Sequence, residues 1–376
     1  MKIHRNILLN PGPATTSQKI KEALVVSDIC PRETEFGNLT QWVREKLLEV
    51  VKAPKQEYKT ILIPGSGTYT IESGLVSLFP HKDEKKSKML ILINGAYGER
   101  MSEICKTYHL DTLEIRGDYT NPIDLVLVKD TLKKYQEEIF AVSFVHHETT
   151  TGVLNPLKEL LEIIHSYHML SFVDCMSSFA GIEIDFTKTP MDLCISSSNK
   201  CIQGIAGVGI VLANTKALSW MKNNPRRIYS LDLLSHLKAL EKDNQFLFTP
   251  CVQVMYALKA AIEEFFEENE LKINRYHRYE QLYQNMYKGL GQLGFESIVE
   301  STFHSKILTT FKLERMGKRI DFQKMHDFFY ERSITIYPGK IANLGMETFR
   351  IANIGDLTLD DISYFLKTME AFISLN

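Results

Sequence analysis

Leu170-Ser-Phe-Val-Asp174-Cys-Met-Ser-Ser178 and Asp192-Leu-Cys-Ile-Ser-Ser-Ser-Asn199-Lys200 are the two segments of the sequence that decide the fold. Each contains a short apolar run, which is typical of a strand buried on both faces. Each run is followed within a few residues by a polar turn that carries one charged side chain. Buried strands of this kind, separated by amphipathic segments, predict an α/β protein with a mostly parallel sheet.

The charged residues Asp174 and Lys200 are therefore expected at strand ends. Ligands of open α/β sheets bind outside the carboxyl ends of the strands. A lysine and a carboxylate at that edge suit pyridoxal phosphate, since the lysine forms a Schiff base and the aspartate holds the proton of the pyridine nitrogen. An ordinary strand-end aspartate and an exposed loop lysine are the alternative. The glycines at 204, 207 and 209 favour a turn around a ligand.

A second candidate ligand site is the turn Gly65-Ser66-Gly67-Thr68. It lies between a predicted strand at 58–64 and a predicted helix at 70–79. Free N–H groups and the positive end of the helix dipole at such a turn can hold a phosphate group. The turn lacks the Lys-Ser/Thr pair of a P-loop, so a plain tight connection is the alternative.

Further strands are predicted at 89–94 and 139–145, and both are followed by residues that could carry chemistry. Tyr97 follows the first strand and could stack on a planar ring or simply pack. His146-His147-Glu148 follows the second strand and invites a zinc interpretation. We reject a metal site here, because adjacent residues of an extended segment point to opposite faces and no third ligand shows a metal-like spacing.

Composition narrows the class of function. The chain has 376 residues, of which 44% are hydrophobic and 24% charged, and its 44 basic and 46 acidic residues give a net charge of −2. This balance argues against nucleic acid or a membrane as a partner and favours small molecules. The sequence shows neither a membrane span nor a signal peptide, and its six cysteines form no Cys-x-x-Cys pair, so we expect a cytoplasmic protein with reduced thiols.

The order of predicted elements suggests three parts. Residues 1–16 contain Pro11-Gly12-Pro13 and are expected to form an extended N-terminal arm. Residues 17–248 hold the alternating strands and helices of a large domain. Residues 249–376 are expected to form a smaller α+β domain that begins with one long helical stretch, from Val252 to about Leu290.

Taken together, the motifs resemble those of a known family. In chain order they read LLNPGPATTS, CPRE, PGSGTYTIES, NGAYGER, HHETTTGVLNP, VDCMSSFAG, SSSNKCIQG, FTP, IYPGK and FRIANIGD. The chain is similar over nearly its whole length to the class V aminotransferases, which are pyridoxal-phosphate-dependent enzymes of fold type I. The resemblance implies a large domain with a mixed, mostly parallel sheet in an αβα arrangement and a smaller C-terminal α+β domain.

The resemblance also assigns residues to pyridoxal 5'-phosphate. Lys200 corresponds to the lysine that binds the cofactor covalently, and Asp174 to the partner of the pyridine nitrogen. The other implied cofactor contacts are the phosphate cradle of Ser66, Gly67 and Thr68, the stacking Tyr97, Thr149 near the ring hydroxyl, Asn199 near the phosphate, and Thr249. The position of Thr249 implies a homodimer with shared active sites, in which this residue reaches the phosphate in the neighbouring subunit.

For substrates, the resemblance implies transfer of an amino group from 2-aminoethylphosphonate to pyruvate. Arg350 corresponds to the arginine that binds the acidic group of the substrate, and Arg32 is a second candidate for the phosphonate. Ala352 and His147 depart from the family pattern, which leaves the choice of substrate open. The alternatives are an aminotransferase of the alanine–glyoxylate or phosphoserine type and a non-catalytic protein that binds phosphate or a nucleotide.

Overall fold

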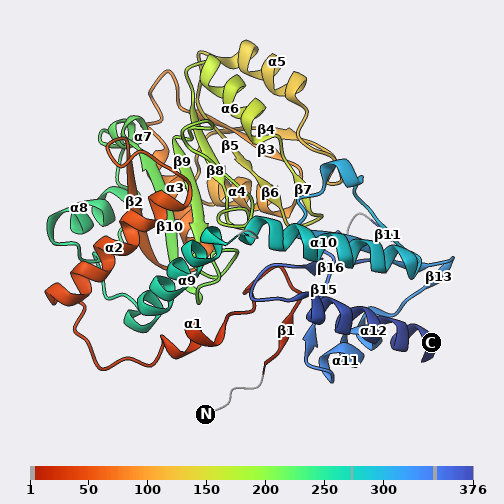
Figure 1. Ribbon diagram of the computed structural model, residues 1–376. Coiled ribbons are helices and arrows are strands. Elements are labelled where there is room, and N and C mark those ends of the chain that lie inside the picture. Colours follow the sequence, from red (N-terminus) through yellow and green to blue (C-terminus); the bar gives the residue numbers. More distant parts are fainter. Residues whose placement is uncertain (1–4, 272–273, 342–344, 376) are drawn as a thin grey trace.

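The chain folds into a large lobe and a small lobe that pack side by side (Figure 1). The computed structural model describes residues 5–271, 274–341 and 345–375. The large lobe is built on a seven-stranded sheet, and the small lobe on a five-stranded sheet. Each lobe has its own apolar core.

The central sheet of the large lobe confirms the predicted α/β class. Its strand order is β2-β10-β9-β8-β5-β3-β4, and β10 is antiparallel to both neighbours while the other pairs are parallel. The strands span β2 (Tyr58–Gly65), β3 (Lys88–Ile93), β4 (Thr112–Arg116), β5 (Ile139–Val145), β8 (Leu170–Asp174), β9 (Leu193–Ser197) and β10 (Gly207–Asn214). Every residue of β5, β8 and β9 is buried, which explains their continuous apolar runs.

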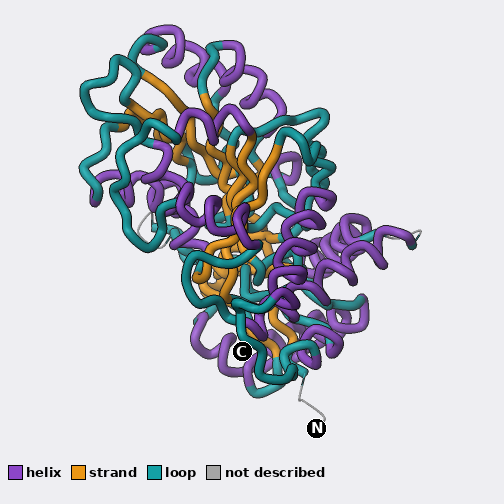
Figure 2. The backbone as a smooth tube through the Cα atoms, turned by 90° about the vertical axis from the view of Figure 1, so that its left-hand side faces the viewer, coloured by secondary structure: helices purple, strands orange, loops and turns teal. Residues whose placement is uncertain are grey.

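Helices cover this sheet (Figure 2). The helices of the large lobe are α1 (Gln18–Glu22), α2 (Thr34–Val50), α3 (Gly67–Leu78), α4 (Ala96–Thr107), α5 (Leu125–Tyr135), α6 (Leu157–Ser166), α7 (Thr215–Met221), α8 (Leu233–Asp243) and α9 (Val252–Glu270). Ser66, Asp124, Asn214 and Asp232 each accept a hydrogen bond from a first-turn N–H. Such caps satisfy donors that have no partner inside the helix.

The small lobe packs three helices against its sheet. Strands β11 (Phe295–Ser297), β12 (Leu308–Arg315), β16 (Thr348–Ala352) and β15 (Tyr337–Pro338) follow one another in the sheet, and β13 (Lys318–Arg319) pairs with β12. The helices are α10 (Arg275–Gln292), α11 (Phe322–Tyr330) and α12 (Leu359–Leu375). The N-terminal arm joins this lobe, because β1 (Ile7–Leu8) pairs in parallel with β14 (Ile334–Thr335).

The long helical stretch predicted from Val252 to Leu290 is wrong in one respect, because it is two helices. Helix α9 packs Met255 and Leu258 into the core of the large lobe, whereas α10 packs Tyr279 and Met286 into the core of the small lobe. The chain therefore passes from the core of the large lobe to the core of the small lobe between α9 and α10. The domain limit at residue 249 stays a prediction.

Arg275, the first residue of α10, connects this helix to the end of α9. Its guanidinium is fully buried and binds Glu268 through two hydrogen bonds, of 3.1 Å from Nε and 2.8 Å from Nη2. It also donates from Nη1 to the carbonyl oxygens of Cys201 and Ile202, at 3.1 and 3.3 Å. One buried cation thus joins α9 and α10 to the turn that follows Lys200.

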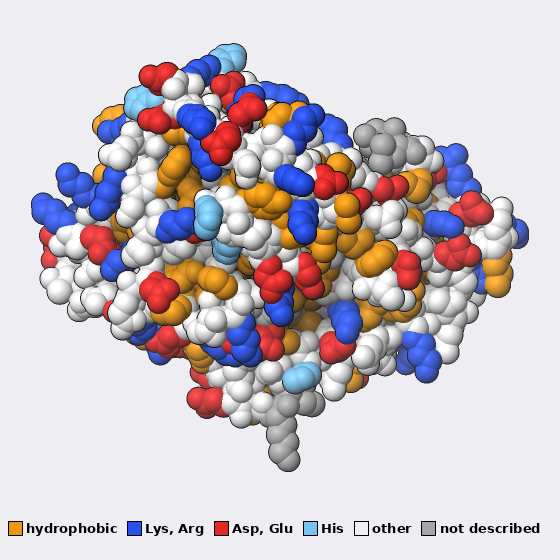
Figure 3. All heavy atoms as spheres, turned by 90° about the horizontal axis from the view of Figure 1, so that it is seen from above, with side chains coloured by type: hydrophobic (Ala, Val, Ile, Leu, Met, Phe, Trp, Pro, Cys, Tyr) orange, Lys and Arg blue, Asp and Glu red, His pale blue; other side chains and the backbone are white. Residues whose placement is uncertain are grey.

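The face of the molecule seen from above carries acidic, basic and hydrophobic side chains that are mixed, without a large area of one charge (Figure 3). Within the described part of the chain, no helix is long and apolar enough to cross a membrane.

Replacement of Arg275 by Met is expected to destabilise the protein strongly, because it removes a fully buried guanidinium, leaves two carbonyl groups without their donor and leaves Glu268 paired with Arg278 alone. Loss of one member of a buried ion pair costs about 3–5 kcal/mol. The free energy of unfolding, measured with urea, should fall by this amount. Lys312→Met is the matched control, since Lys312 pairs with Glu296 at the surface and such pairs contribute less than about 1 kcal/mol. Equal losses in both variants would contradict the role of Arg275.

Candidate active site

The residues predicted to carry chemistry meet at one edge of the large sheet. Strands β2, β3, β5, β8 and β9 run in the same direction, so their carboxyl ends share this edge. A cavity of about 200 Å³ opens there. Its lining residues are Ser66, Gly67, Thr68, Ile71, Tyr97, Arg100, Asp174, Met176, Ser197, Asn199, Lys200, Ala206 and Gly207. Seven residues that the resemblance assigns to the cofactor therefore line one cavity.

Lys200 lies in the turn after β9 and is held by the N-terminal arm. Its Nζ donates a hydrogen bond of 2.8 Å to the carbonyl oxygen of Pro11. A Cβ atom at Gly12 would lie 2.4 Å from the same Nζ, and the φ of Gly12, +131°, also favours glycine. Burial lowers the pKa of the Lys200 amine against the opposing effect of Tyr97. The neutral amine, which is the nucleophilic form, is thereby favoured.

Asp174 ends the neighbouring strand β8 and is 4% exposed. Its Oδ1 accepts a hydrogen bond of 2.8 Å from the N–H of Met176. Burial nevertheless raises the pKa of this carboxyl group to about 7. A buried carboxylate without a cationic partner is costly, and a protonated pyridine nitrogen would supply that partner. The environment of Asp174 therefore fits pyridoxal phosphate.

The residues predicted to form the phosphate cradle lie at the start of α3. Ser66 caps this helix, and a Cβ atom at Gly67 would lie 2.5 Å from the sulfur of Met176. Nη1 of Arg100 donates a hydrogen bond of 3.2 Å to Oγ1 of Thr68. Helix N–H groups, two hydroxyl groups and a guanidinium are the donors that a phosphate group requires.

Arg100 is a site residue that the sequence-based analysis missed. It stands three residues after Tyr97 in the motif Asn94-Gly-Ala-Tyr97-Gly-Glu-Arg100, so both side chains lie on one face of α4. The guanidinium carbon is 4.8 Å from the centre of the Tyr97 ring. This spacing after the predicted stacking residue was the signal that could have identified it.

Tyr97 also contacts a residue of the small lobe. Nζ of Lys340 donates a hydrogen bond of 3.2 Å to the Tyr97 hydroxyl and lies 4.6 Å from the ring centre. Burial alone would raise the pKa of Tyr97, but the charges of Lys340 and Lys200 and a hydrogen bond with Thr149 outweigh it and lower this pKa.

The carboxylate of Glu148 holds the backbone of Tyr97 in place through a hydrogen bond. Glu148 is fully buried, and its Oε2 accepts from the N–H groups of Tyr97 and Gly98, at 3.3 and 3.4 Å. Its Oε1 accepts from the N–H and hydroxyl of Thr150, at 3.0 and 2.6 Å. A Cβ atom at Gly95 would lie 2.2 Å from the carboxyl carbon. The glutamate of the His-His-Glu motif thus anchors the N-terminus of α4.

Arg350 and Thr149 come together where the two lobes meet. The side chain of Arg350 is buried, and its Nε and Nη1 donate to the carbonyl oxygens of Pro338 and Thr149, at 3.0 and 3.1 Å. Burial lowers the pKa of Arg350, although the nearby Tyr97 hydroxyl favours its charged form. An arginine of the small lobe therefore reaches the large-lobe segment that follows β5.

Arg32 and Thr249 lie outside the residues that line the cavity of the single chain. Arg32 is exposed, and its Nη1 donates a hydrogen bond of 2.7 Å to the carbonyl oxygen of Phe246. Thr249 is exposed as well. Their roles toward substrate and toward a neighbouring subunit stay predictions.

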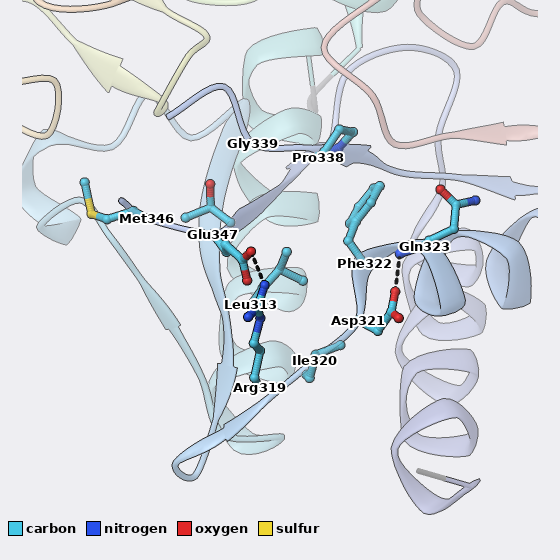
Figure 4. Close-up of a pocket in the computed structure, with 11 residues that line it drawn as sticks. Leu313, Arg319, Ile320, Asp321, Phe322, Gln323, Pro338, Gly339, Met346 and Glu347 are labelled. Atoms are coloured by element: carbon cyan, nitrogen blue, oxygen red, sulfur yellow. Dashed lines mark hydrogen bonds and ion pairs between the residues drawn. The ribbon is translucent and has the colours of Figure 1, made fainter. Parts of the chain in front are cut away.

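A larger cavity, of about 640 Å³, lies in the small lobe away from Lys200 (Figure 4). The charged side chains on its wall are already engaged. Arg319 forms an ion pair with Glu347, and Asp321 accepts from the N–H of Gln323 at the start of α11. This wall carries none of the residues predicted for the cofactor.

Comparison with known proteins agrees with this geometry. The model of the family described as "Aminotransferase class-V" matches residues 16–351. The chain therefore belongs to the class V aminotransferase family, whose members are pyridoxal-phosphate-dependent enzymes, and the predicted family is confirmed.

Individual relatives narrow the comparison. The 2-aminoethylphosphonate–pyruvate transaminase of Bacillus cytotoxicus is 36% identical over 363 residues, which cover 96% of each chain. The transaminase of the same name from Lysinibacillus sphaericus is 36% identical over 366 residues, or 97% of each chain. The solved structure of pyridoxamine–pyruvate aminotransferase from Mesorhizobium loti has a TM-score of 0.88 at 22% identity, covering 99% of this chain and 93% of that one. It confirms the fold.

Replacement of Asp174 by Asn is expected to stabilise the cofactor-free protein at neutral and alkaline pH. The pKa of Asp174 is about 7 in the folded chain and about 3.9 when unfolded, so its ionisation lowers stability as the pH rises from about 4 to 7. The variant lacks this loss. Thermal unfolding should show similar stability of the two proteins at pH 4 and a gain for the variant at pH 8 on the order of 4 kcal/mol.

Asp130→Asn is the matched control for this measurement, because Asp130 is exposed on α5. Its pH profile should follow that of the wild type. If Asp174→Asn also follows the wild type, the buried carboxyl group carries no such cost.

Proposed function

We propose that this aminotransferase holds pyridoxal 5'-phosphate in the cavity at the carboxyl edge of the large sheet. The observation that carries the proposal is the placement of Lys200 and Asp174 at the ends of the adjacent strands β9 and β8, inside the cavity that also holds the phosphate cradle. When bound, the cofactor supplies an electron sink for the carbon that carries the amino group. Arg100 joins Ser66 and Thr68 in holding its phosphate.

The residues of the chain divide the remaining work. Lys200 binds the cofactor covalently, and its amine, released when substrate arrives, moves the proton at the substrate carbon that bears nitrogen. Asp174 holds the proton of the ring nitrogen. Tyr97 packs against the ring, and its position is fixed by the hydrogen bonds of Glu148 to the start of α4. These groups are preorganised, which is the main source of rate enhancement in such sites.

We propose 2-aminoethylphosphonate as the amino donor and pyruvate as the acceptor, giving phosphonoacetaldehyde and L-alanine. The names of relatives that are 36% identical over nearly the full chain support this choice. Arg350 binds the acidic group of both substrates, because a guanidinium can form two parallel hydrogen bonds with either a carboxylate or a phosphonate. Arg32 remains the second candidate for the phosphonate.

The function is tested by a half-reaction with purified, cofactor-loaded protein. Addition of 2-aminoethylphosphonate alone should convert the absorbance of the bound aldehyde form into that of the amine form, and pyruvate should restore it. Lys200→Ala should neither turn over nor yield a labelled peptide after borohydride reduction, because the attachment point is lost. The assignment fails if the wild type responds to alanine and glyoxylate but not to the phosphonate, or if reduction labels another lysine.

We further propose a homodimer in which Thr249 completes the site of the other subunit. Exposure of Thr249 outside the single-chain cavity supports the proposal. Thr249→Val should weaken cofactor binding about ten- to hundredfold, since a hydrogen bond to a charged group contributes roughly 1.5–3 kcal/mol. Cofactor affinity and sedimentation measure this effect. Normal affinity in the variant, or a fully active monomer, would remove the shared-site proposal.

A further inference from the structure

Four cationic side chains gather around Tyr97. Arg100 and Lys200 come from the large lobe, and Lys340 and Arg350 from the small lobe. Among the residues that the structure describes, none of these four forms an ion pair with a carboxylate, whereas Lys55, Arg275 and Lys306 each do. Arg100, Lys340 and Arg350 therefore give the site positive charge that no carboxylate pairs, which favours anionic ligands.

The cations of the large lobe lie at the predicted cofactor cavity, whereas those of the small lobe lie outside the residues that line it. Arg100 contacts Thr68 in the phosphate cradle, and Lys200 lies in the same cavity. Arg350 lies on β16, which pairs with the edge strand β15 so that Tyr337 is opposite Arg350. Lys340 follows β15 after a single glycine, so the two small-lobe cations come from neighbouring strands of one sheet.

These two cations differ in how firmly they are held. Arg350 is 2% exposed and fixed by two carbonyl groups, Pro338 and Thr149. Lys340 is exposed and bound to the Tyr97 hydroxyl at 3.2 Å, a neutral partner that an anion can replace. An arginine offers a rigid fork, whereas a lysine offers a compact charge on a flexible stem.

We propose that Lys340 is a specificity-determining residue that, with Arg350, forms a two-cation subsite for a phosphonate dianion. A carboxylate carries a single charge and is satisfied by Arg350, while the second charge of the phosphonate is met by Lys340. The subsite would thus distinguish the phosphonate donor from the carboxylate acceptor. This inference rests on the proposed function, since it assigns the substrate selectivity of the same site.

The test measures equilibrium binding of two unreactive ligands to the cofactor-loaded protein by calorimetry. Ethylphosphonate, at a pH where it carries two charges, represents the donor, and propionate represents the acceptor. Lys340→Met should weaken ethylphosphonate binding about ten- to hundredfold, as expected for loss of a charge-assisted hydrogen bond, and leave propionate binding within about twofold. Lys340→Arg should restore most of the phosphonate affinity.

Two further variants separate the possible outcomes. Lys288→Met removes an exposed lysine of α10 outside the site and should bind both ligands as the wild type does. Arg350→Lys should weaken binding of both. The inference is overturned if Lys340→Met binds ethylphosphonate normally, loses both ligands equally, or instead loses affinity for pyridoxal phosphate. If the wild type reacts with 2-aminoethylphosphonate and Lys340→Met binds ethylphosphonate as tightly as the wild type, the subsite alone is refuted. If the wild type does not react with 2-aminoethylphosphonate, the proposed function is refuted.

Discussion

A carboxyl group and an amine held out of water at the ends of two adjacent parallel strands are the constraint on which the rest of the structure depends. Neither Asp174 nor Lys200 has a partner of opposite charge within hydrogen-bonding distance in the described chain, and burial shifts both pKa values toward the neutral forms. The surrounding fold must tolerate this cost. The fully buried strands β5 and β9 on either side of β8, and helices capped at their first turns, supply the rigidity that keeps the two groups in place.

The same logic explains several contacts one layer further out. Glu148 accepts hydrogen bonds from two N–H groups at the start of α4 and is itself held by the N–H and hydroxyl of Thr150. Because α4 carries both Tyr97 and Arg100, one buried carboxylate orients two groups of the site. Arg275 holds the carbonyl groups of the turn after Lys200. Such outer contacts determine where the reactive atoms lie without touching a ligand.

Sequence reasoning identified the parts of the site that depend on local order. Lys200 and Asp174 could be predicted because each follows a buried apolar run, and a strand end fixes the edge of the sheet to which a residue belongs. The roles of Lys340 and Glu148 could not be predicted, because their partners are distant in the sequence. Lys340 binds Tyr97, which is 243 residues away, and Glu148 binds N–H groups about 50 residues away. The break between α9 and α10 was missed because both helices continue an apolar helical pattern, while the contacts of Arg275 with Glu268, Cys201 and Ile202 are not visible in that pattern.

The N-terminal arm has a consequence for the way in which the protein is made. The arm supplies the carbonyl group of Pro11 to Lys200, yet it is itself held by pairing of Ile7 with Ile334 and of Thr15 with Gly355. At about 5–20 residues per second, the ribosome adds those partners on the order of tens of seconds after the arm has emerged. The lysine pocket thus closes late in biosynthesis, when nearly the whole chain is available, and a nascent chain with a finished central sheet would still present an unfinished site.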